Sequence, residues 1–455
     1  MNALEKRSVA ALASVYATRM LGLFMVLPVF VLLADDLEAA TPTLIGLAIG
    51  AYGLSQALLQ VPFGLLSDRV GRKRMIYIGL VLFAAGSLLA AGSESIYGVI
   101  AGRVLQGSGA IASVLMALLS DLTREEERTK AMATIGISIG LSFSVSLVLG
   151  PLLASVFGLA GIFYITAALA LLALVIVHQL VPTPHQHHSS ADTQPAKAML
   201  GQVLTDNRLL RLDFGIFALH LVLTALFLVV PVLLQDDLGL PSESHWWFYL
   251  TVMVTSFFAM VPFIIIGEKK RKMKPVLAGA IGLLTLATAG LALADAGLGV
   301  AWGILFLFFM AFNLLEASLP SLISKESPAA SKGTAMGVYS TSQFLGAFAG
   351  GALGGLLLEQ GGLTGVLWPM VGILLVWLAL AATMPTPSYT TSFVLKLRES
   401  ARDRIDAVDE LLRGLPGVQD VVILEGTDTA YLKVDRARFA EDSLAEFDFV
   451  RQGTS

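Results

Sequence analysis

Three ionisable side chains lie inside long apolar segments of this 455-residue sequence, and they are the first candidates for chemistry. Glu316 is the only carboxylate well inside such a segment, and Asn313 precedes it by one helical turn on the same face. Burial out of water favours the neutral form of a carboxyl group, so Glu316 suits a site that binds and releases a proton. The alternative is a structural, hydrogen-bonded carboxyl group.

Arg19 and Arg103 are the other two charges within apolar segments, where a charge is costly unless it faces protein or water. Gln106 and Gly107 predict a polar, closely packed face around Arg103. Arg103 then has a role in coupling or in substrate contact, and the alternative is a hydrogen-bonded structural arginine. Arg19 is expected to cap one side of a cavity or to pair with an acid there. Other polar positions that either line a cavity or only join helices are Tyr16, Gln56, Gln60, His220, Asn313 and Gln343.

The elements that position these side chains are membrane spans. The chain is 56% hydrophobic and only 14% charged, whereas soluble proteins carry about a quarter charged residues. It contains no cysteine, which excludes disulfides, thiol nucleophiles and thiolate metal sites. Apolar runs of spanning length predict twelve helices, at 8–33, 44–66, 75–92, 96–120, 131–153, 160–181, 211–234, 245–267, 275–294, 297–323, 333–357 and 362–384.

Charge asymmetry predicts the orientation of these spans. Lys and Arg occur at the N-terminus, in alternate loops and after residue 390, whereas the opposite loops carry acidic residues such as Asp35, Glu94, Asp236 and Glu359. Basic loops stay on the cytoplasmic side of a membrane. We therefore expect a multi-pass protein of the inner (cytoplasmic) membrane with both termini in the cytoplasm.

The two sets of six spans repeat each other. Asp68 aligns with Glu268 at a spacing of 200 residues, and Arg128 aligns with Lys332 at a spacing of 204. Six spans per half return the chain to the same side, so the repeat is parallel, about an axis along the membrane normal.

The segment "GLLSDRVGRK" (Gly64–Lys73) predicts a conformational latch between the second and third spans. A carboxylate at Asp68 can accept hydrogen bonds from backbone amides at the start of a helix in the opposite half. The basic residues Arg69, Arg72 and Lys73 can pair with Asp121 or with residues 125–127. The alternative is that these charges only fix topology. The predicted latch comprises Gly64, Asp68, Arg69, Gly71, Arg72 and Lys73, with Asp121, Arg128, Gly333 and Thr334 as partners.

These residues resemble a known family. "GLLSDRVGRK" resembles motif A of the major facilitator superfamily, "RVLQGSGA" (103–110) resembles its motif B, and Gly150-Pro151 resembles the core of its motif C. With the tail described below, the chain resembles the YajR-type branch of drug-efflux transporters. The resemblance implies proton-driven export by alternating access. Motif C departs from the family pattern, because Ser146 stands where a glycine is expected.

The tail after Met384 has lower hydrophobicity and a β-α-β-β-α pattern, which is consistent with a small ferredoxin-like domain. It resembles heavy-metal-associated domains but lacks their Cys-x-x-Cys. The predicted organisation is a six-helix half at 1–181, a cytoplasmic linker at 182–210, a second half at 211–384, a linker at 385–391 and the tail domain at 392–455.

The predicted function is export of small amphipathic or drug-like molecules in exchange for protons. A proton symporter that imports a solute, or a receptor that signals through its tail without transport, are the alternatives. The sequence contains no P-loop motif, so we do not expect transport driven by ATP hydrolysis. It shows no nucleophile–base pair, so we do not expect an enzyme. The expected partners are a small-molecule substrate, protons and lipid, with a possible ligand or self-contact at the tail. We expect no nucleic acid, no cofactor and no metal, including at His185–His188.

Overall fold

The computed structural model describes residues 1–183, 196–292, 297–328, 331–387, 391–398, 404–423 and 429–435, with 438–440, 444, 447 and 449. Within these ranges the side chains of 125, 126, 128, 129, 196–199, 391, 392, 394, 396, 429 and 431 are not described. The predictions for His185–His188 and for the Arg128 side chain fall outside the described part, as does most of the predicted last helix of the tail.

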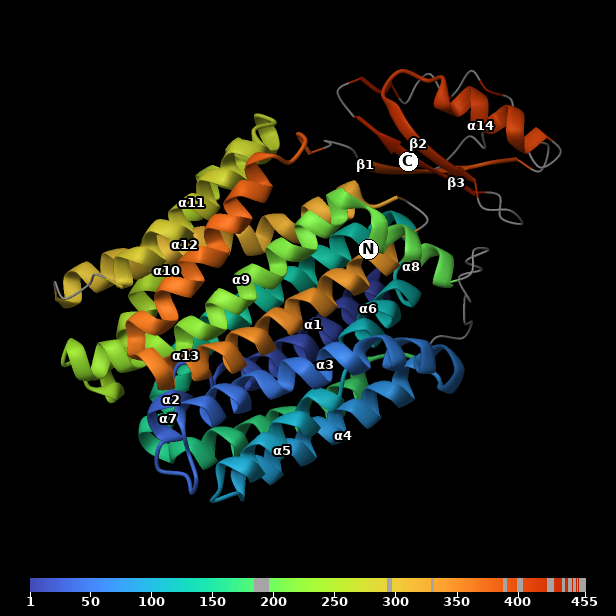
Figure 1. Ribbon diagram of the computed structural model, residues 1–455. Coiled ribbons are helices and arrows are strands. Elements are labelled where there is room, and N and C mark those ends of the chain that lie inside the picture. The colour runs from blue at the N-terminus through green and yellow to red at the C-terminus, as the bar shows by residue number, and fades with distance from the viewer. Residues whose placement is uncertain are drawn as a thin grey trace. The chain divides into compact units, whose positions relative to one another are not determined.

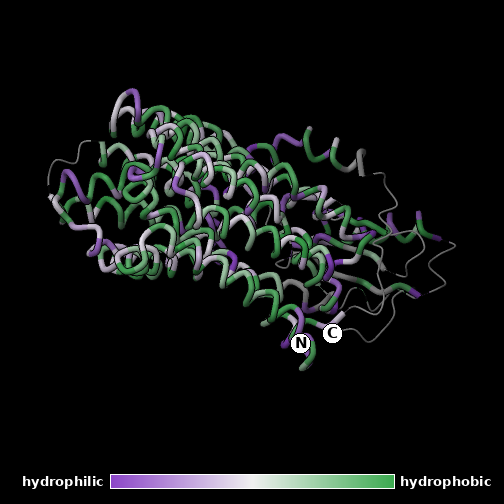
Figure 2. The backbone as a smooth tube through the Cα atoms, turned by 90° about the horizontal axis from the view of Figure 1, so that it is seen from below, coloured by the Kyte–Doolittle hydropathy of each residue, from purple (hydrophilic) through white to green (hydrophobic). Residues whose placement is uncertain are grey.

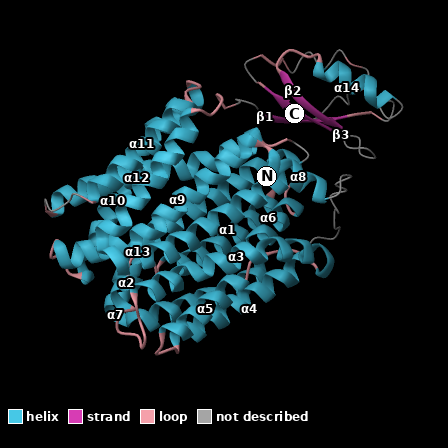
Figure 3. Cartoon of the chain, viewed as in Figure 1, coloured by secondary structure: helices cyan, strands magenta, loops and turns pink. Residues whose placement is uncertain are grey.

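The protein is predominantly helical, as predicted, and strands occur among the described residues only in the tail (Figure 3). Hydrophobic residues run along most of each long helix (Figure 2). The helices are α1 (Ala3–Phe24), α2 (Phe30–Leu33), α3 (Pro42–Val70), α4 (Arg72–Ala91), α5 (Ile96–Ser108), α6 (Ala112–Asp121), α7 (Glu125–Leu180), α8 (Ala196–Thr205), α9 (Asn207–Val232), α10 (His245–Lys269), α11 (Met273–Leu291), α12 (Leu298–Glu326), α13 (Lys332–Ala382) and α14 (Ile405–Arg413), with a π-turn η1 (Leu233–Asp237) and a 3-10 turn η2 (Ser242–Ser244).

In the described part of the chain, nine helical segments are long and apolar enough to cross a membrane. Two of these segments are long enough to cross a membrane twice, because α7 has 56 residues and α13 has 51, and a helix rises by 1.5 Å per residue. Each is interrupted by a glycine with positive φ, Gly158 at 63° and Gly362 at 62°. These glycines lie 204 residues apart, at the offset of the sequence repeat. Dividing α7 and α13 there, and adding α1, gives the predicted twelve spans.

Two predicted spans are broken in the middle. The first is divided into α1 and α2, with Pro28 in the intervening turn, and the fourth is divided into α5 and α6 around Gly109. The second span is longer than predicted, because α3 continues to Val70 and makes Asp68 helical. Gly71 joins α3 to α4 with a φ of 106°, a conformation that glycine adopts without strain.

Helices α3 and α13, from opposite halves, touch backbone to backbone. A Cβ at Gly46 would lie 2.2 Å from the carbonyl oxygen of Gly351, so neither helix tolerates a side chain there. The Thr43 amide donates to the Glu359 carboxylate at 3.1 Å close by. We call this end of the bundle, which carries Thr43 and Glu359, the acidic end. At this end α3 and α13 are in contact in this structure.

The glycines spaced by four residues on α13, Gly346, Gly350 and Gly354, do not form this contact between halves. They pack on α9 of their own half, where a Cβ at Gly350 would lie 2.2 Å from the Leu221 carbonyl oxygen. The contact with α3 comes from Gly351 and Gly355, one position further along the chain. The two sets of glycines are offset by one residue, so they face directions about 100° apart around α13. Composition alone does not show which set faces α9 and which faces α3.

The tail contains a three-stranded antiparallel sheet in the order β1-β3-β2, formed by β1 (Thr391–Lys396), β2 (Val418–Ile423) and β3 (Thr429–Val434). Helix α14 lies between β1 and β2 in the chain and buries Val408 and Leu412 in the core of this domain (Figure 1). The small α+β domain predicted at the C-terminus is therefore present.

The tail belongs to a compact unit that also includes residues 190–212 and 318–339. Within it, Lys433 on β3 donates to the carbonyl oxygens of Lys325, at 2.8 Å, and of Ser327, around the end of α12. A lysine at a helix C-terminus stabilises the free carbonyl groups and the negative end of the helix dipole. Arg208 and Glu326 form an ion pair in the same unit.

Candidate functional site

A polar cluster in the C-terminal half brings together Glu316 and Asn313 of α12, Gln343 of α13 and His220 of α9. Gln343 lies between the two ionisable groups. Its side-chain amide donates to Glu316 Oε1 at 3.3 Å and lies 2.8 Å from His220 Nε2. The other ring nitrogen of His220, Nδ1, lies 3.3 Å from the Ile216 carbonyl oxygen, its acceptor. These contacts fit the His220 tautomer that donates from Nδ1 and accepts at Nε2.

The second oxygen of Glu316 is available for a proton. Oε2 lies 3.9 Å from His220 Nε2 and has no hydrogen-bond partner, although it is buried. The whole Glu316 side chain is 30% exposed. Asn313 turns to α10 instead, where its amide donates to Ser256 Oγ at 3.4 Å. Of the predicted residues, His220, Glu316 and Gln343 thus form one hydrogen-bonded group, with Asn313 beside it.

A second polar cluster, in the N-terminal half, contains Arg19 of α1 with Tyr52, Gln56 and Gln60 of α3. Arg19 Nη2 donates to the Tyr52 hydroxyl at 2.9 Å and to Gln56 Oε1 at 2.6 Å. Gln56 donates to Gln60 Oε1 at 3.5 Å. Of the two roles expected for Arg19, the pairing with an acid is not seen here, because no Asp or Glu of the described residues forms an ion pair with it. The Tyr16 hydroxyl donates to the Ala112 carbonyl oxygen instead of to a side chain of this cluster.

Aromatic rings connect the two clusters across the halves. Tyr52 meets Phe344, the neighbour of Gln343, edge to face with ring centroids 6.3 Å apart. A second series runs from Phe24 to Phe143 and on to Phe312, at centroid distances of 5.0 and 5.5 Å. The Phe312 ring lies 6.1 Å from the His220 ring. Both polar clusters therefore border the apolar contact between the halves.

Arg103 has a different environment, deep between α5 and α3. Its guanidinium donates to the carbonyl oxygens of Ala48 and Ile49 and, at 2.9 Å, to Gln106 Oε1. Gln106 in turn donates to Ser87. Gly107 lets α5 approach α3 here, because a Cβ on it would lie 2.3 Å from the Tyr52 carbonyl oxygen.

The predicted latch segment is partly assembled. Arg72 pairs with Asp68 at 2.5 Å and with Asp121 at 3.4 Å, and it donates to Ser67 Oγ at 2.6 Å. Asp68 remains 54% exposed. The Lys73 ammonium donates to the Val181 carbonyl oxygen at the end of α7, and its pairing with an acid stays a prediction.

Comparison with known proteins identifies the family. Residues 12–351 match the Major Facilitator Superfamily model. The chain belongs to the major facilitator superfamily. It is 46% identical to the inner membrane transport protein YajR of Escherichia coli over 434 residues, covering 95% of this chain and 94% of YajR. It is 26% identical to the multidrug resistance protein MdtH of Aeromonas salmonicida, covering 76% of this chain and 87% of MdtH.

A solved structure shares the fold. The inward-facing structure of a bacterial homologue of the human lysosomal transporter Spinster superposes with a TM-score of 0.66 at 14% identity, covering 84% of this chain and 96% of the other. The protein is therefore a multi-pass membrane transporter of the major facilitator superfamily.

The motifs of the superfamily occupy distinct places in the fold. In motif A, Gly64 lies beside Ser113 of α6, where a Cβ would be 3.3 Å from the serine hydroxyl, and Arg69 is exposed. In motif C, a Cβ at Gly150 would lie 2.4 Å from the Met25 carbonyl oxygen, so Gly150 and Pro151 are at the contact of α7 with α1. The prediction that Asp68 accepts from Gly333 and Thr334 stays a prediction.

Two polar features were not anticipated from the sequence. Asp213, near the start of α9, is 5% exposed, and neither carboxylate oxygen has a hydrogen-bond partner. Asp213 is thus a buried carboxylate in addition to Glu316, although it does not lie well inside a predicted span. Asp213 was overlooked because it lies at the edge of the predicted span 211–234.

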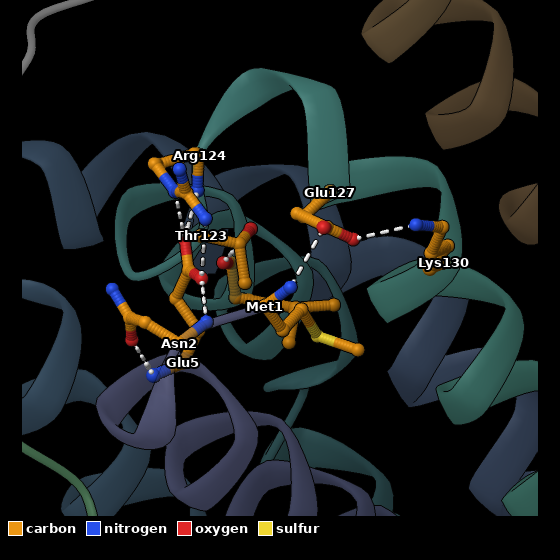
Figure 4. A network of polar contacts seen from close by, with 8 residues as sticks. Met1, Asn2, Glu5, Thr123, Arg124, Glu127 and Lys130 are labelled. Carbon is orange, nitrogen blue, oxygen red and sulfur yellow. Dashed lines mark hydrogen bonds and ion pairs between the residues drawn. The ribbon is translucent and has the colours of Figure 1, made fainter. Parts of the chain in front are cut away.

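The second feature is an ion-pair network at the start of α1 and α7 (Figure 4). The Arg124 backbone amide and guanidinium both donate to Glu5 Oε1 at 3.0 Å, and the Met1 ammonium pairs with Glu127 at 2.6 Å. The hydrogen bonds from Arg124 lower the pKa of Glu5 to about 2. Asn2 caps α1 and forms a capping box with Glu5, which is the local signal that could have indicated this site.

Proposed function

We propose that the protein is a proton-coupled secondary transporter of the inner membrane that exports small amphipathic molecules in exchange for protons by alternating access. The group of Glu316, Gln343 and His220 carries this proposal. It combines a buried carboxylate oxygen without a hydrogen-bond partner, an imidazole 3.9 Å away and an amide that bonds to both. Such a group can take up a proton on Glu316 without unfolding the helices around it. The name of MdtH supports export of drug-like molecules.

The contact at the acidic end of the bundle supports alternating access. Gly46 of α3 packs on Gly351 of α13 at the acidic end, which the predicted orientation places on the periplasmic side. A conformation that releases substrate on that side requires α3 and α13 to separate there. The Asp68–Arg72–Asp121 group at the opposite end is then available to latch the cytoplasmic side.

Proton flux in inside-out vesicles with an acid interior tests the proposal. Amphipathic molecules are added to wild type, to Glu316→Gln and to Asp237→Asn, whose carboxylate is exposed outside the cluster. We expect substrate-dependent proton release in the wild type and in Asp237→Asn, and its loss in Glu316→Gln. Release that persists in Glu316→Gln would move the proton site to another acid, with Asp213 the next to be changed.

The direction of coupling decides between the proposal and its alternatives. Substrate-driven proton movement in the same direction as the substrate would indicate a symporter. Binding to the purified protein without flux in vesicles would indicate a receptor.

The latch has its own test. Asp68→Asn removes the charge that pairs with Arg72 while keeping the side-chain shape. We expect normal membrane insertion and a several-fold loss of transport rate, because the latched conformation loses the carboxylate that is predicted to accept hydrogen bonds from the start of a helix in the opposite half. Transport at the full wild-type rate would show that these charges only fix topology.

A further inference from the structure

Arg19 is a buried cation whose hydrogen-bonding capacity is largely unused. Its side chain is 2% exposed, and a guanidinium carries five N–H donors. Only Nη2 has acceptors, the Tyr52 hydroxyl and Gln56 Oε1, whereas Nε and Nη1 have none. Burying a charge without a counter-ion is strongly unfavourable, and natural proteins keep such a group where it does a task.

The surroundings of Arg19 lack an acid but provide aromatic surface. No described Asp or Glu forms an ion pair with the guanidinium, which lies over the Phe83 ring at 5.7 Å from its centroid. Its partner Tyr52 meets Phe344 of the opposite half. The free N–H groups therefore lie beside aromatic rings and close to the contact between the halves, where a transported molecule must pass.

We propose that Arg19 binds the anionic group of the transported molecule, so that the substrates are amphipathic organic anions with a carboxylate or sulfonate on an aromatic or apolar body. This inference rests on the transport function proposed above. The anion supplies the acceptors that Nε and Nη1 lack, and the rings of Phe83, Tyr52 and Phe344 contact the apolar body. Because Arg19 is buried in this conformation, the anion reaches it during the conformational cycle.

The charge of the substrate has a measurable consequence. Exchange of one proton for one monovalent anion moves two charges across the membrane, whereas a neutral substrate moves one and a monovalent cation moves none. A potassium diffusion potential, negative on the cytoplasmic side, should therefore accelerate export of an anion.

The first experiment measures binding to the purified full chain in nanodiscs by equilibrium dialysis. Three radiolabelled probes share one ring system and differ in charge, namely 2-naphthoate, 2-naphthylmethanol and 2-naphthylmethylammonium. We expect the wild type to bind naphthoate most tightly. Arg19→Gln should lose affinity for naphthoate by about tenfold or more and change affinity for the alcohol less than about twofold, because only the anion uses the charged donors.

Two further variants control for folding and for charge. Arg19→Lys keeps the cation and should retain part of the naphthoate affinity. Arg7→Gln removes an exposed cation from the same helix and should leave naphthoate binding unchanged. The thermal unfolding of each variant shows that it is folded. Naphthoate affinity unchanged in Arg19→Gln, tightest binding of the ammonium probe, or no naphthoate binding by the folded wild type would each overturn the inference.

Flux measurements separate this inference from the transport proposal. Arg19-dependent naphthoate binding without any proton-coupled flux would sustain the anion site and overturn proton exchange. Proton-coupled flux of the ammonium or alcohol probe with exclusion of naphthoate would sustain proton exchange and overturn the anion site.

Discussion

The two intramembrane arginines are almost equally buried, at 2% exposure for Arg19 and 1% for Arg103, yet their surroundings differ. Arg103 uses all three guanidinium nitrogens on two backbone carbonyls and Gln106, and its guanidinium lies over the Tyr52 ring at 5.3 Å from the centroid. Arg19 uses one nitrogen, Nη2, which donates to the hydroxyl of the same Tyr52 and to Gln56 Oε1. Burial alone therefore does not separate a structural charge from a binding charge. The number of guanidinium nitrogens with an acceptor is the difference on which the proposed binding role of Arg19 rests.

The strongest test of this comparison is Arg103→Gln. The change leaves Gln106 Oε1 without its donor and removes the bonds that join α5 to α3. Hydrogen bonds to charged groups contribute about 1.5 to 3 kcal/mol each, so we expect a loss of about 3 kcal/mol or more in stability. Thermal unfolding and the yield of monodisperse protein measure it.

The matched variant is Arg19→Gln. Because it removes an unsatisfied buried charge, it should alter stability by less than about 1 kcal/mol or raise it. Equal destabilisation by the two variants would show that Arg19 is also structural, and the comparison would fail.

A smaller effect separates the two roles of Tyr52. Tyr52→Phe keeps the ring under Arg103 but removes the hydroxyl that accepts from Arg19, so it should cost only about 1 kcal/mol in stability. Tyr52→Leu also removes the ring and should cost about 2 kcal/mol or more. Thermal unfolding of both variants in the same detergent checks this order. If the Phe variant were the less stable, the hydroxyl contact rather than the ring contact would be the structural one.

A third arginine gives the smallest expected effect. Arg124 is 61% exposed and pairs with Glu5, which has a pKa of about 2 in the folded protein instead of 4.5. Because the folded-state pKa is the lower one, the pair stabilises the fold above about pH 4.5, and this stabilisation is lost as the pH falls toward 2. Glu5→Gln should therefore unfold at a lower temperature than wild type at pH 7.

The unfolding temperatures of wild type and Glu5→Gln should differ less at pH 3 than at pH 7. A difference in unfolding temperature that stayed constant between pH 7 and pH 3 would mean that packing of Glu5, rather than its charge, stabilises the start of α1.

The candidate sites could be predicted in part. Arg19, Arg103 and Glu316 stood out because a charge within an apolar run is costly, and the structure buries both arginines and half-buries the glutamate. Their partners could not be predicted in the same way. Lys73, expected to pair with an acid, caps α7 in this structure, and Asp213 was overlooked at the edge of a span.

The sequence by itself determined the spans, the parallel repeat and the motifs of the superfamily, because these depend on residue type and spacing along the chain. It also placed Asn313 and Glu316 on one helix face. Only the tertiary structure decided that Gln343 joins Glu316 to His220, that Arg103 is satisfied and that Arg19 is not. These hydrogen bonds join side chains of different helices. Successive residues of a helix point about 100° apart, so the rotation of each helix about its own axis decides which side chains meet.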